Sequence, residues 1–260
     1  MSFERSGKHI HSEPHVFNQQ AQFSKGLSGR GGNTSPIWSK APIEGLCDPK
    51  YASFFFDDFF AYVTADEWTA AGDSAAVTVT DARNGVLNIT PGAVTDTHAA
   101  MIHTTAQHWA IDAAKKIYFE AAITCTETGS LLASLFCGMS AGTFGSDVPL
   151  VDAGTPTTDD RIAFWRTDTT GTYWSCGVSD GTTQDDADTA ITFVSGTEYR
   201  LGFIADVNSV EFYINDSLVR TVTDAGDIPD TEMNICIAVK NGSGAKEAVT
   251  VDWVKCVQVR

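Results

Sequence analysis

The feature that most constrains this chain is a two-residue alternation of apolar and polar side chains, interrupted at short intervals by turns. Tyr199, Leu201, Phe203 and Ala205 are apolar at alternate positions. Successive side chains of a β-strand point to opposite faces, so this pattern is typical of a strand with one buried face. Composition agrees, because 20 Val and 15 Ile stand against only 9 Leu and branched side chains favour sheets. The chain is predicted to be all-β.

Turn chemistry indicates that the strands pair antiparallel. Val210, Phe212 and Ile214 alternate and are followed by Asn215-Asp216, a dipeptide typical of a tight hairpin turn. Similar segments recur along the chain, and helix is expected only as a turn near 106–114. The further predicted strands are 54–62, 76–80, 86–90, 99–104, 131–139, 161–167, 173–179, 189–194, 233–240 and 248–259. So many short strands indicate an antiparallel two-sheet sandwich over residues 54–260.

Residues 1–53 have a different texture and are predicted to form an extended N-terminal arm. The first 50 residues hold six basic and four acidic side chains, a net charge of +2, and the other 210 hold 11 and 29, a net charge of −18. We expect the arm to order against a partner, although an inert disordered tail is the alternative. Its predicted contact residues are Phe17, Phe23, Lys25, Arg30, Trp38, Lys40 and Ile43.

Charge and hydropathy exclude several classes of partner. A net charge of −16 argues against a nucleic-acid or anionic-membrane surface, since both require a basic footprint. No apolar run approaches the roughly 20 residues of a membrane span. The N-terminus lacks the order of a secretory signal, so assembly in the cytoplasm is expected.

The six cysteines are spread singly, which favours buried reduced thiols, while disulfides stay open for an extracellular particle.

Two runs of sequence resemble a known superfamily. The segments YRLGFIAD at 199–206 and VEFYINDSLV at 210–219 are similar to paired strands of concanavalin A-like (laminin-G-like) jelly rolls. The closing VDWV at 251–254, the opening FDDF at 56–59 and IYFEA at 117–121 also resemble that pattern. The likeness covers about residues 54–260. It implies a jelly-roll sandwich but not a function, because this fold carries lectins, glycosidases and structural modules.

The sequence offers no recognisable catalytic group, and the chain is predicted not to be an enzyme. Glycoside hydrolysis requires two carboxylates at a defined separation. Glycosidases of the superfamily carry Glu, Asp and Glu at alternate positions of one strand, whereas here Glu120 is followed by Ala122 and Thr124 on its face. Glu127, seven residues further on, falls in another part of the strand and turn. No GxSxG motif is present either.

No cofactor is expected, and two kinds of ligand stay open: a structural calcium ion, with acidity for solubility as the alternative role of the Asp residues, and a carbohydrate. The resemblance implies that Asp57 or Asp58 with Asp252 could bind calcium where the first and last strands meet. One predicted acidic loop holds four aspartates, Asp180, Asp185, Asp186 and Asp188.

Carbohydrate binding needs exposed aromatic rings, and the candidates are Trp165, Tyr173 and Trp174. Alternation places Trp165 opposite Ile162 and Phe164, facing outward, although sandwich aromatics more often belong to the core.

The layout of an acidic sandwich with a long arm resembles bacteriophage virion proteins of the capsid decoration or cement type. The segments FFFDDFF, NGVLNIT and VEFYIND share the texture of such proteins. This resemblance implies a structural virion subunit, assembled in the host cytoplasm. It would form dimers or trimers, attach to capsid or other virion proteins through its arm, and stabilise the shell. The alternatives are a glycan- or receptor-binding module of a phage tail or cell-surface protein, and a degenerate glycosidase.

Overall fold

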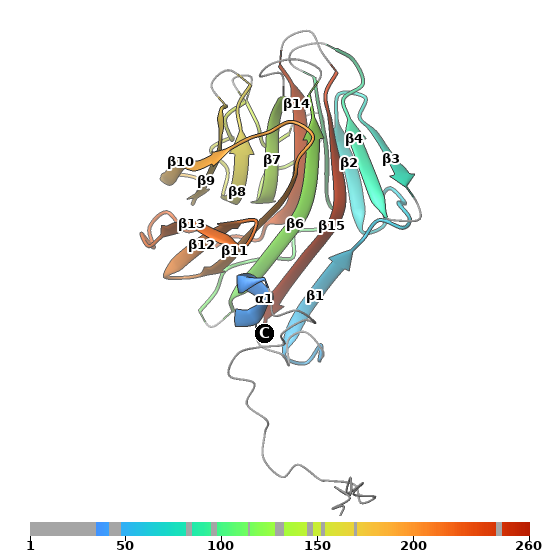
Figure 1. The fold of residues 1–260 in the computed structure, drawn as a ribbon. Helices are drawn as coiled ribbons and strands as arrows, with labels where there is room; N and C mark the ends of the chain where they lie inside the picture. Colours follow the sequence, from blue (N-terminus) through green and yellow to red (C-terminus); the bar gives the residue numbers. More distant parts are fainter. Residues whose placement is uncertain are drawn as a thin grey trace, which may run out of the picture.

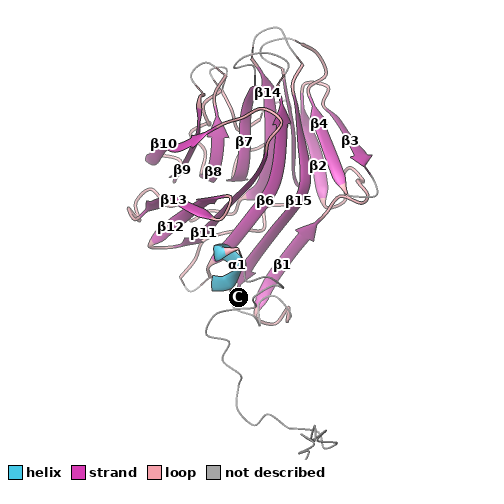
Figure 2. Cartoon of the chain, viewed as in Figure 1, coloured by secondary structure: helices cyan, strands magenta, loops and turns pink. Residues whose placement is uncertain are grey.

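The computed structural model contains two antiparallel β-sheets that pack face to face (Figures 1 and 2). It describes residues 35–41, 48–81, 85–94, 98–113, 115–127, 133–144, 148–151, 154–168, 171–242 and 246–260. The predicted all-β sandwich is therefore confirmed. No helix within these ranges is long and apolar enough to cross a bilayer.

The first sheet, sheet A, has eight strands in the order β13-β12-β11-β6-β15-β4-β3, with β1 also paired to β15. Its strands are β1 (Ala52–Asp57), β3 (Ala76–Asp81), β4 (Val86–Thr90), β6 (Ile117–Thr126), β11 (Glu198–Asp206), β12 (Ser209–Ile214), β13 (Ser217–Val222) and β15 (Ala248–Val259). Strand β15 is long enough to pair with β6 on one side and with both β4 and β1 on the other.

The second sheet, sheet B, has seven strands in the order β10-β9-β8-β7-β14-β5-β2. Its strands are β2 (Trp68–Gly72), β5 (Ala99–Thr104), β7 (Ala133–Ser140), β8 (Arg161–Arg166), β9 (Tyr173–Ser179), β10 (Gln184–Thr192) and β14 (Asn234–Asn241). Every residue of β7 and β14 is buried, because Phe144, Val148 and Leu150 cover part of the outer face. Beyond them, burial extends through β8 and all of β9 except Tyr173, and only the edge strand β10 is mostly exposed or half-buried.

Aromatic rings join the two sheets in the core. Phe119 of β6 and Phe203 of β11 stack with ring centroids 4.9 Å apart, and Phe203 contacts Phe212 of β12 at 6.2 Å. Phe212 also meets Phe164 of β8, in the opposite sheet, edge to face at 5.3 Å. Edge-to-face and offset-stacked rings are the favoured aromatic geometries. The inward faces predicted from alternation at Phe203 and Phe212 are confirmed, since both are fully buried.

The predicted hairpin forms between β12 and β13. Asn215 and Asp216 both adopt positive φ, 48° and 68°, as a tight turn of this kind requires. The Asn215 carboxamide oxygen accepts a hydrogen bond from the backbone N–H of Arg200, at 2.8 Å. The turn is thereby tied to the neighbouring strand β11.

The described part of the arm contains a helix where an extended segment was expected. Helix α1 spans Pro36–Lys40, with Pro at its first position, where the missing N–H costs nothing. It packs on the outer face of sheet A, and Ile37 is 1% exposed beside Gly202. A Cβ at Gly202 would lie 2.4 Å from the Ile37 side chain. A helix of five residues is not stable by itself, and the packing of Ile37 against sheet A at Gly202 stabilises it.

Three strands differ from the prediction. The acidic stretch at 185–188 lies in strand β10 and not in a loop, and Asp185 of that strand pairs with Arg220 of β13, a strand of the other sheet. An edge strand exposed to solvent carries few apolar residues, so its sequence shows no alternation of apolar and polar side chains. Strand β2 was also missed, and β1 begins at Ala52, two residues before the predicted start of the sandwich.

Replacing Phe212 with Ala should lower the free energy of unfolding by about 3–5 kcal/mol, because the change leaves a cavity where the two sheets meet. Chemical denaturation followed by circular dichroism measures this. The matched control is Phe60→Ala, whose ring is 57% exposed and whose loss should cost under about 1 kcal/mol. Equal losses for the two variants would show that the aromatic contacts do not bind the sheets together.

Candidate functional site

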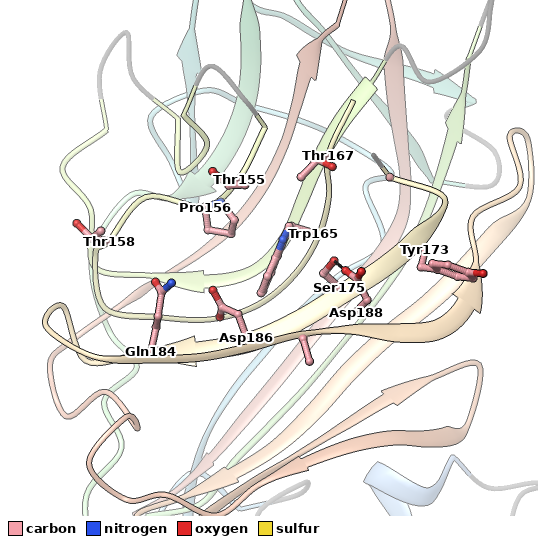
Figure 3. Close-up of a pocket in the computed structure, with 12 residues that line it drawn as sticks. Thr155, Pro156, Thr158, Trp165, Thr167, Tyr173, Ser175, Gln184, Asp186 and Asp188 are labelled. Atoms are coloured by element: carbon pink, nitrogen blue, oxygen red, sulfur yellow. Dashed lines mark hydrogen bonds between the residues drawn. The ribbon is translucent and has the colours of Figure 1, made fainter. Parts of the chain in front are cut away.

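A hollow of about 530 Å³ lies on the outer face of sheet B, over strands β8, β9 and β10. We call it the β8–β10 hollow, and Figure 3 shows its walls. Its lining residues are Thr155, Pro156, Thr158, Trp165, Thr167, Gly171, Tyr173, Ser175, Gln184, Asp186, Ala187 and Asp188. Concave sites that combine aromatic surface with a few polar groups are typical of small-ligand pockets.

Two of the predicted aromatic candidates line this hollow. Trp165 stands in its middle and Tyr173 at one end (Figure 3). Trp165 is 5% exposed and lies on the opposite face of β8 from Ile162 and Phe164, with the Arg161 guanidinium 5.6 Å from its ring centroid. Tyr173 is 44% exposed. The hollow therefore has an apolar floor and a free ring at its rim.

The third aromatic candidate does not belong to the site. Trp174 is 1% exposed and packs edge to face against Phe193 and Tyr199 in the core. It follows Tyr173 directly in β9, so its side chain points to the opposite face. Alternation alone could have separated the two residues.

Two carboxylates from alternate positions of β10 face the hollow. Asp188 accepts a hydrogen bond of 2.6 Å from the Ser175 hydroxyl. Asp186 Oδ2 accepts one of 2.6 Å from Arg161, while its buried Oδ1 has no hydrogen-bond partner. The absence of a side chain at Gly177 makes room for this oxygen, since a Cβ there would lie 2.3 Å from it.

The environment of Asp186 changes its acidity. Burial raises the pKa of the Asp186 carboxyl above its ordinary value, although the Arg161 charge opposes the shift. An unsatisfied buried oxygen is costly unless a ligand or water supplies a donor. The exposed Asp188 carboxylate can in addition accept hydrogen bonds from hydroxyl groups that enter the hollow.

A second concave region, of about 450 Å³, lies on the outer face of sheet A beside helix α1. We call it the Trp253 groove. Its lining residues are Ser35, Trp38, Phe56, Asp58, Glu120, Arg200, Asp252, Trp253 and Lys255. Strand β15 has a bulge here, because Val251 and Trp253 oppose consecutive residues of β6, Ile123 and Ala122. The additional residue, Asp252, lines the groove together with Trp253.

Glu120 lies at the base of this groove and is 3% exposed. Its carboxylate accepts hydrogen bonds from the Trp38 indole N–H, at 2.5 Å, and from the Ser35 hydroxyl, at 3.4 Å. Burial raises the pKa of the Glu120 carboxyl above its ordinary value. Glu127 instead forms a buried ion pair with Arg166. The two glutamates thus do not face a common site.

The structure brings two of the three calcium candidates, Asp58 and Asp252, into one groove and sets Asp57 apart. Asp57 accepts hydrogen bonds from the Trp68 indole N–H at 2.7 Å and from the Phe59 backbone N–H at 2.8 Å. Asp58 and Asp252 both line the Trp253 groove. Within the described ranges no three Asp, Glu, His or Cys side chains are grouped as metal ligands would be. A calcium site at this position stays a prediction.

Of the predicted arm contacts, only Trp38 and Lys40 lie within the described residues. The Trp38 indole N–H donates a hydrogen bond to Glu120. The Lys40 ammonium donates to Glu211 at 2.5 Å and to the Tyr213 hydroxyl at 2.8 Å. Both side chains thus form hydrogen bonds with sheet A of the same chain. The other arm residues, Phe17, Phe23, Lys25, Arg30 and Ile43, lie outside the described residues.

Five of the six cysteines are described, and all five are free and buried, as predicted. Burial raises the pKa of the Cys176 thiol to about 12. Thiols with such raised pKa values are poor nucleophiles and poor metal ligands at neutral pH. Cys47 lies outside the described residues.

Known structures share this fold at low sequence identity. No family model matches the chain, and no curated protein is similar to it in sequence. The potassium-bound carbohydrate recognition domain of Emp46p is 13% identical, with a TM-score of 0.55 over 76% of this chain and 94% of that domain. Bacillus licheniformis β-glucanase is 14% identical, with a TM-score of 0.53 over 78% and 97%. Crh5 transglycosylase is 14% identical, with a TM-score of 0.51 over 80% and 84%.

These neighbours establish the concanavalin A-like jelly roll and change one prediction. The prediction that the chain is not an enzyme is wrong on this finding, because a β-glucanase and a transglycosylase use the same fold. The strand of Glu120 carries no second carboxylate. The pair that shares a hollow, Asp186 and Asp188, lies on strand β10, in a stretch predicted to be a loop.

The Glu120→Gln variant should gain stability relative to the native chain between about pH 4 and pH 7. The raised folded-state pKa of Glu120 means that its contribution to stability is present below the unfolded-state pKa and is lost as pH rises through the folded-state value. Glutamine still offers an oxygen to Trp38 but does not titrate. Urea denaturation at both pH values measures the difference, with Glu198→Gln, on an exposed side chain, as control. A pH-independent difference would contradict the prediction.

Proposed function

We propose that the chain is a glycan-binding β-sandwich and that its ligand occupies the β8–β10 hollow. The observation that carries this proposal is the meeting of Tyr173 and Trp165 with two carboxylates in one concavity. Aromatic rings pack against the apolar faces of sugars, and carboxylates accept hydrogen bonds from their hydroxyl groups. The carbohydrate recognition domain of Emp46p, which has the same fold, supports the assignment.

The charges around the hollow favour neutral sugars. No Lys or Arg is among the described residues that line it, and the nearby Arg161 is already paired with Asp186. An anionic sugar would meet the Asp188 carboxylate without a compensating cation, which is unfavourable. A neutral oligosaccharide is therefore the proposed ligand class.

Tyr173→Ala should weaken binding of a neutral oligosaccharide at least about tenfold, because losing the buried face of a ring removes roughly 1.5–3 kcal/mol. Asp188→Asn should have a similar effect through the loss of charge-assisted hydrogen bonds. A glycan array identifies the ligand, and calorimetry measures the affinities. Tyr51→Ala is the matched control, because Tyr51 is 49% exposed and lies outside the hollow. Undiminished binding by both site variants would refute the assignment.

Glycoside hydrolysis at the same hollow is the second candidate function that we propose. Its motivation is that Asp186 has a pKa raised by burial, while Asp188, on the same face, is exposed and hydrogen-bonded to Ser175. Carboxylates in unlike environments can divide the acid and base roles. The test is release of reducing ends from a β-glucan. Turnover lost in both Asp186→Asn and Asp188→Asn would support it, and a native chain that binds without turnover would exclude it.

A place in a phage particle, as a self-associating subunit on a capsid or tail, remains our proposal from the sequence resemblance. The segments FFFDDFF, NGVLNIT and VEFYIND, which carry that resemblance, lie mainly on and after β1, on β4 and on β12. A glycan site on the outer face of such a subunit would serve attachment to a surface. Mass spectrometry of purified particles tests the location, and light scattering tests the oligomeric state.

A further inference from the structure

The Trp253 groove carries charges that the chain itself does not neutralise. Arg200 is paired with Asp216, and the Lys255 ammonium lies 3.9 Å from the centroid of the Trp38 ring, beside Glu120. Glu120 itself accepts from Trp38 and Ser35. Asp58 and Asp252, by contrast, take part in no ion pair or side-chain hydrogen bond among the described residues. Arg200 and Lys255 line the same groove, but neither is within ion-pair distance of these two carboxylates.

These two carboxylates are close enough to affect each other. Burial raises the pKa of the Asp252 carboxyl, and the negative charge of Asp58 raises it further. Like charges held in one groove repel, and a cation between them would relieve this repulsion. The β15 bulge is what places Asp252 there, and bulges often re-aim side chains at functional sites.

The walls of the groove are aromatic and partly uncovered. Phe56 is 48% exposed, and Phe54 beside it in β1 is 52% exposed. Trp253 is half-buried and lines the groove opposite helix α1, from which Trp38 projects. A planar cation can stack on such rings while it pairs with carboxylates, and guanidinium suits both contacts better than ammonium.

We propose that the Trp253 groove is a docking site for an arginine-bearing segment of a partner protein. The guanidinium group pairs with Asp252 and Asp58, and the side chain lies against Trp253 and Phe56. The exposed Phe54 extends the apolar surface for a residue that flanks the arginine. This site is on the opposite sheet from the β8–β10 hollow, so it does not depend on the glycan proposal.

The test uses the full chain, labelled with ¹⁵N, and two small probes followed by NMR. The probes are N-acetyl-arginine amide and N-acetyl-citrulline amide, which have nearly the same shape but differ in charge. The arginine probe should shift the Trp253 indole resonance with an affinity at least about tenfold higher than that of citrulline. Equal affinities, or shifts outside the groove only, would overturn the proposal.

Variants separate the contributions of charge and aromatic surface. Asp252→Asn and Trp253→Ala should each weaken arginine binding about fivefold or more, while Asp230→Asn, on an exposed residue outside the groove, should leave it unchanged. Unchanged amide spectra away from the groove show that each variant is folded.

The double variant Lys25→Gln/Arg30→Gln identifies the occupant. Tighter probe binding by that variant would mean that the chain's own basic residues compete for the groove, and would overturn the assignment to a partner.

Discussion

The contact of Phe212 with Phe164 is the interaction on which the rest of the sandwich depends. Phe212 also touches Phe203, which stacks on Phe119, so one continuous set of rings joins three strands of sheet A to β8 of sheet B. Close-packed interiors fix the relative position of the elements that contribute to them. The outward-facing residues of these same strands are thereby held in place. Strand β8 directs Phe164 inward and Trp165 into the hollow from adjacent positions.

Both candidate sites occupy outer faces where the regular sheet pattern is interrupted. In sheet B, the cover formed by Phe144, Val148 and Leu150 lies over the inner strands and leaves the β8–β10 hollow open. In sheet A, helix α1 covers part of the surface and the β15 bulge shapes the remainder. The core therefore determines the orientation of the sites, while irregular segments determine their depth and chemistry.

The parts of this structure that sequence predicts are those governed by burial on one face. Tyr199, Leu201 and Phe203 reveal β11 because burial requires apolar residues at every second position. Asn215 and Asp216 reveal the hairpin through their backbone conformation. The first half of strand β10 is not predicted because its residues 184–188 are all intermediate or exposed, and without burial no alternation is required. Helix α1 is not predicted because its stability comes from a tertiary contact, the packing of Ile37 at Gly202.

The same limits apply to the candidate sites. Trp165 could be assigned to an outer face by alternation with Ile162 and Phe164, but its neighbours Asp186 and Asp188 come from a different strand. Their meeting depends on the pairing of β9 with β8 and β10, which no local pattern contains. The bulge that turns Asp252 toward the groove is likewise a property of the register between β15 and β6.

The seat of helix α1 on sheet A has a mechanical consequence. A pull on the chain at Ser35 first reaches α1, which is held by Ile37 at Gly202, by Trp38 on Glu120 and by Lys40 on Glu211. These are a few side-chain contacts, whereas β1 is joined to β15 by a ladder of six residue pairs. The helix would detach before any strand, and its five residues, Pro36–Lys40, would then span up to roughly 17 Å, at 3.3–3.6 Å per residue. Helix α1 would thus yield under load while the ladder between β1 and β15 stays paired.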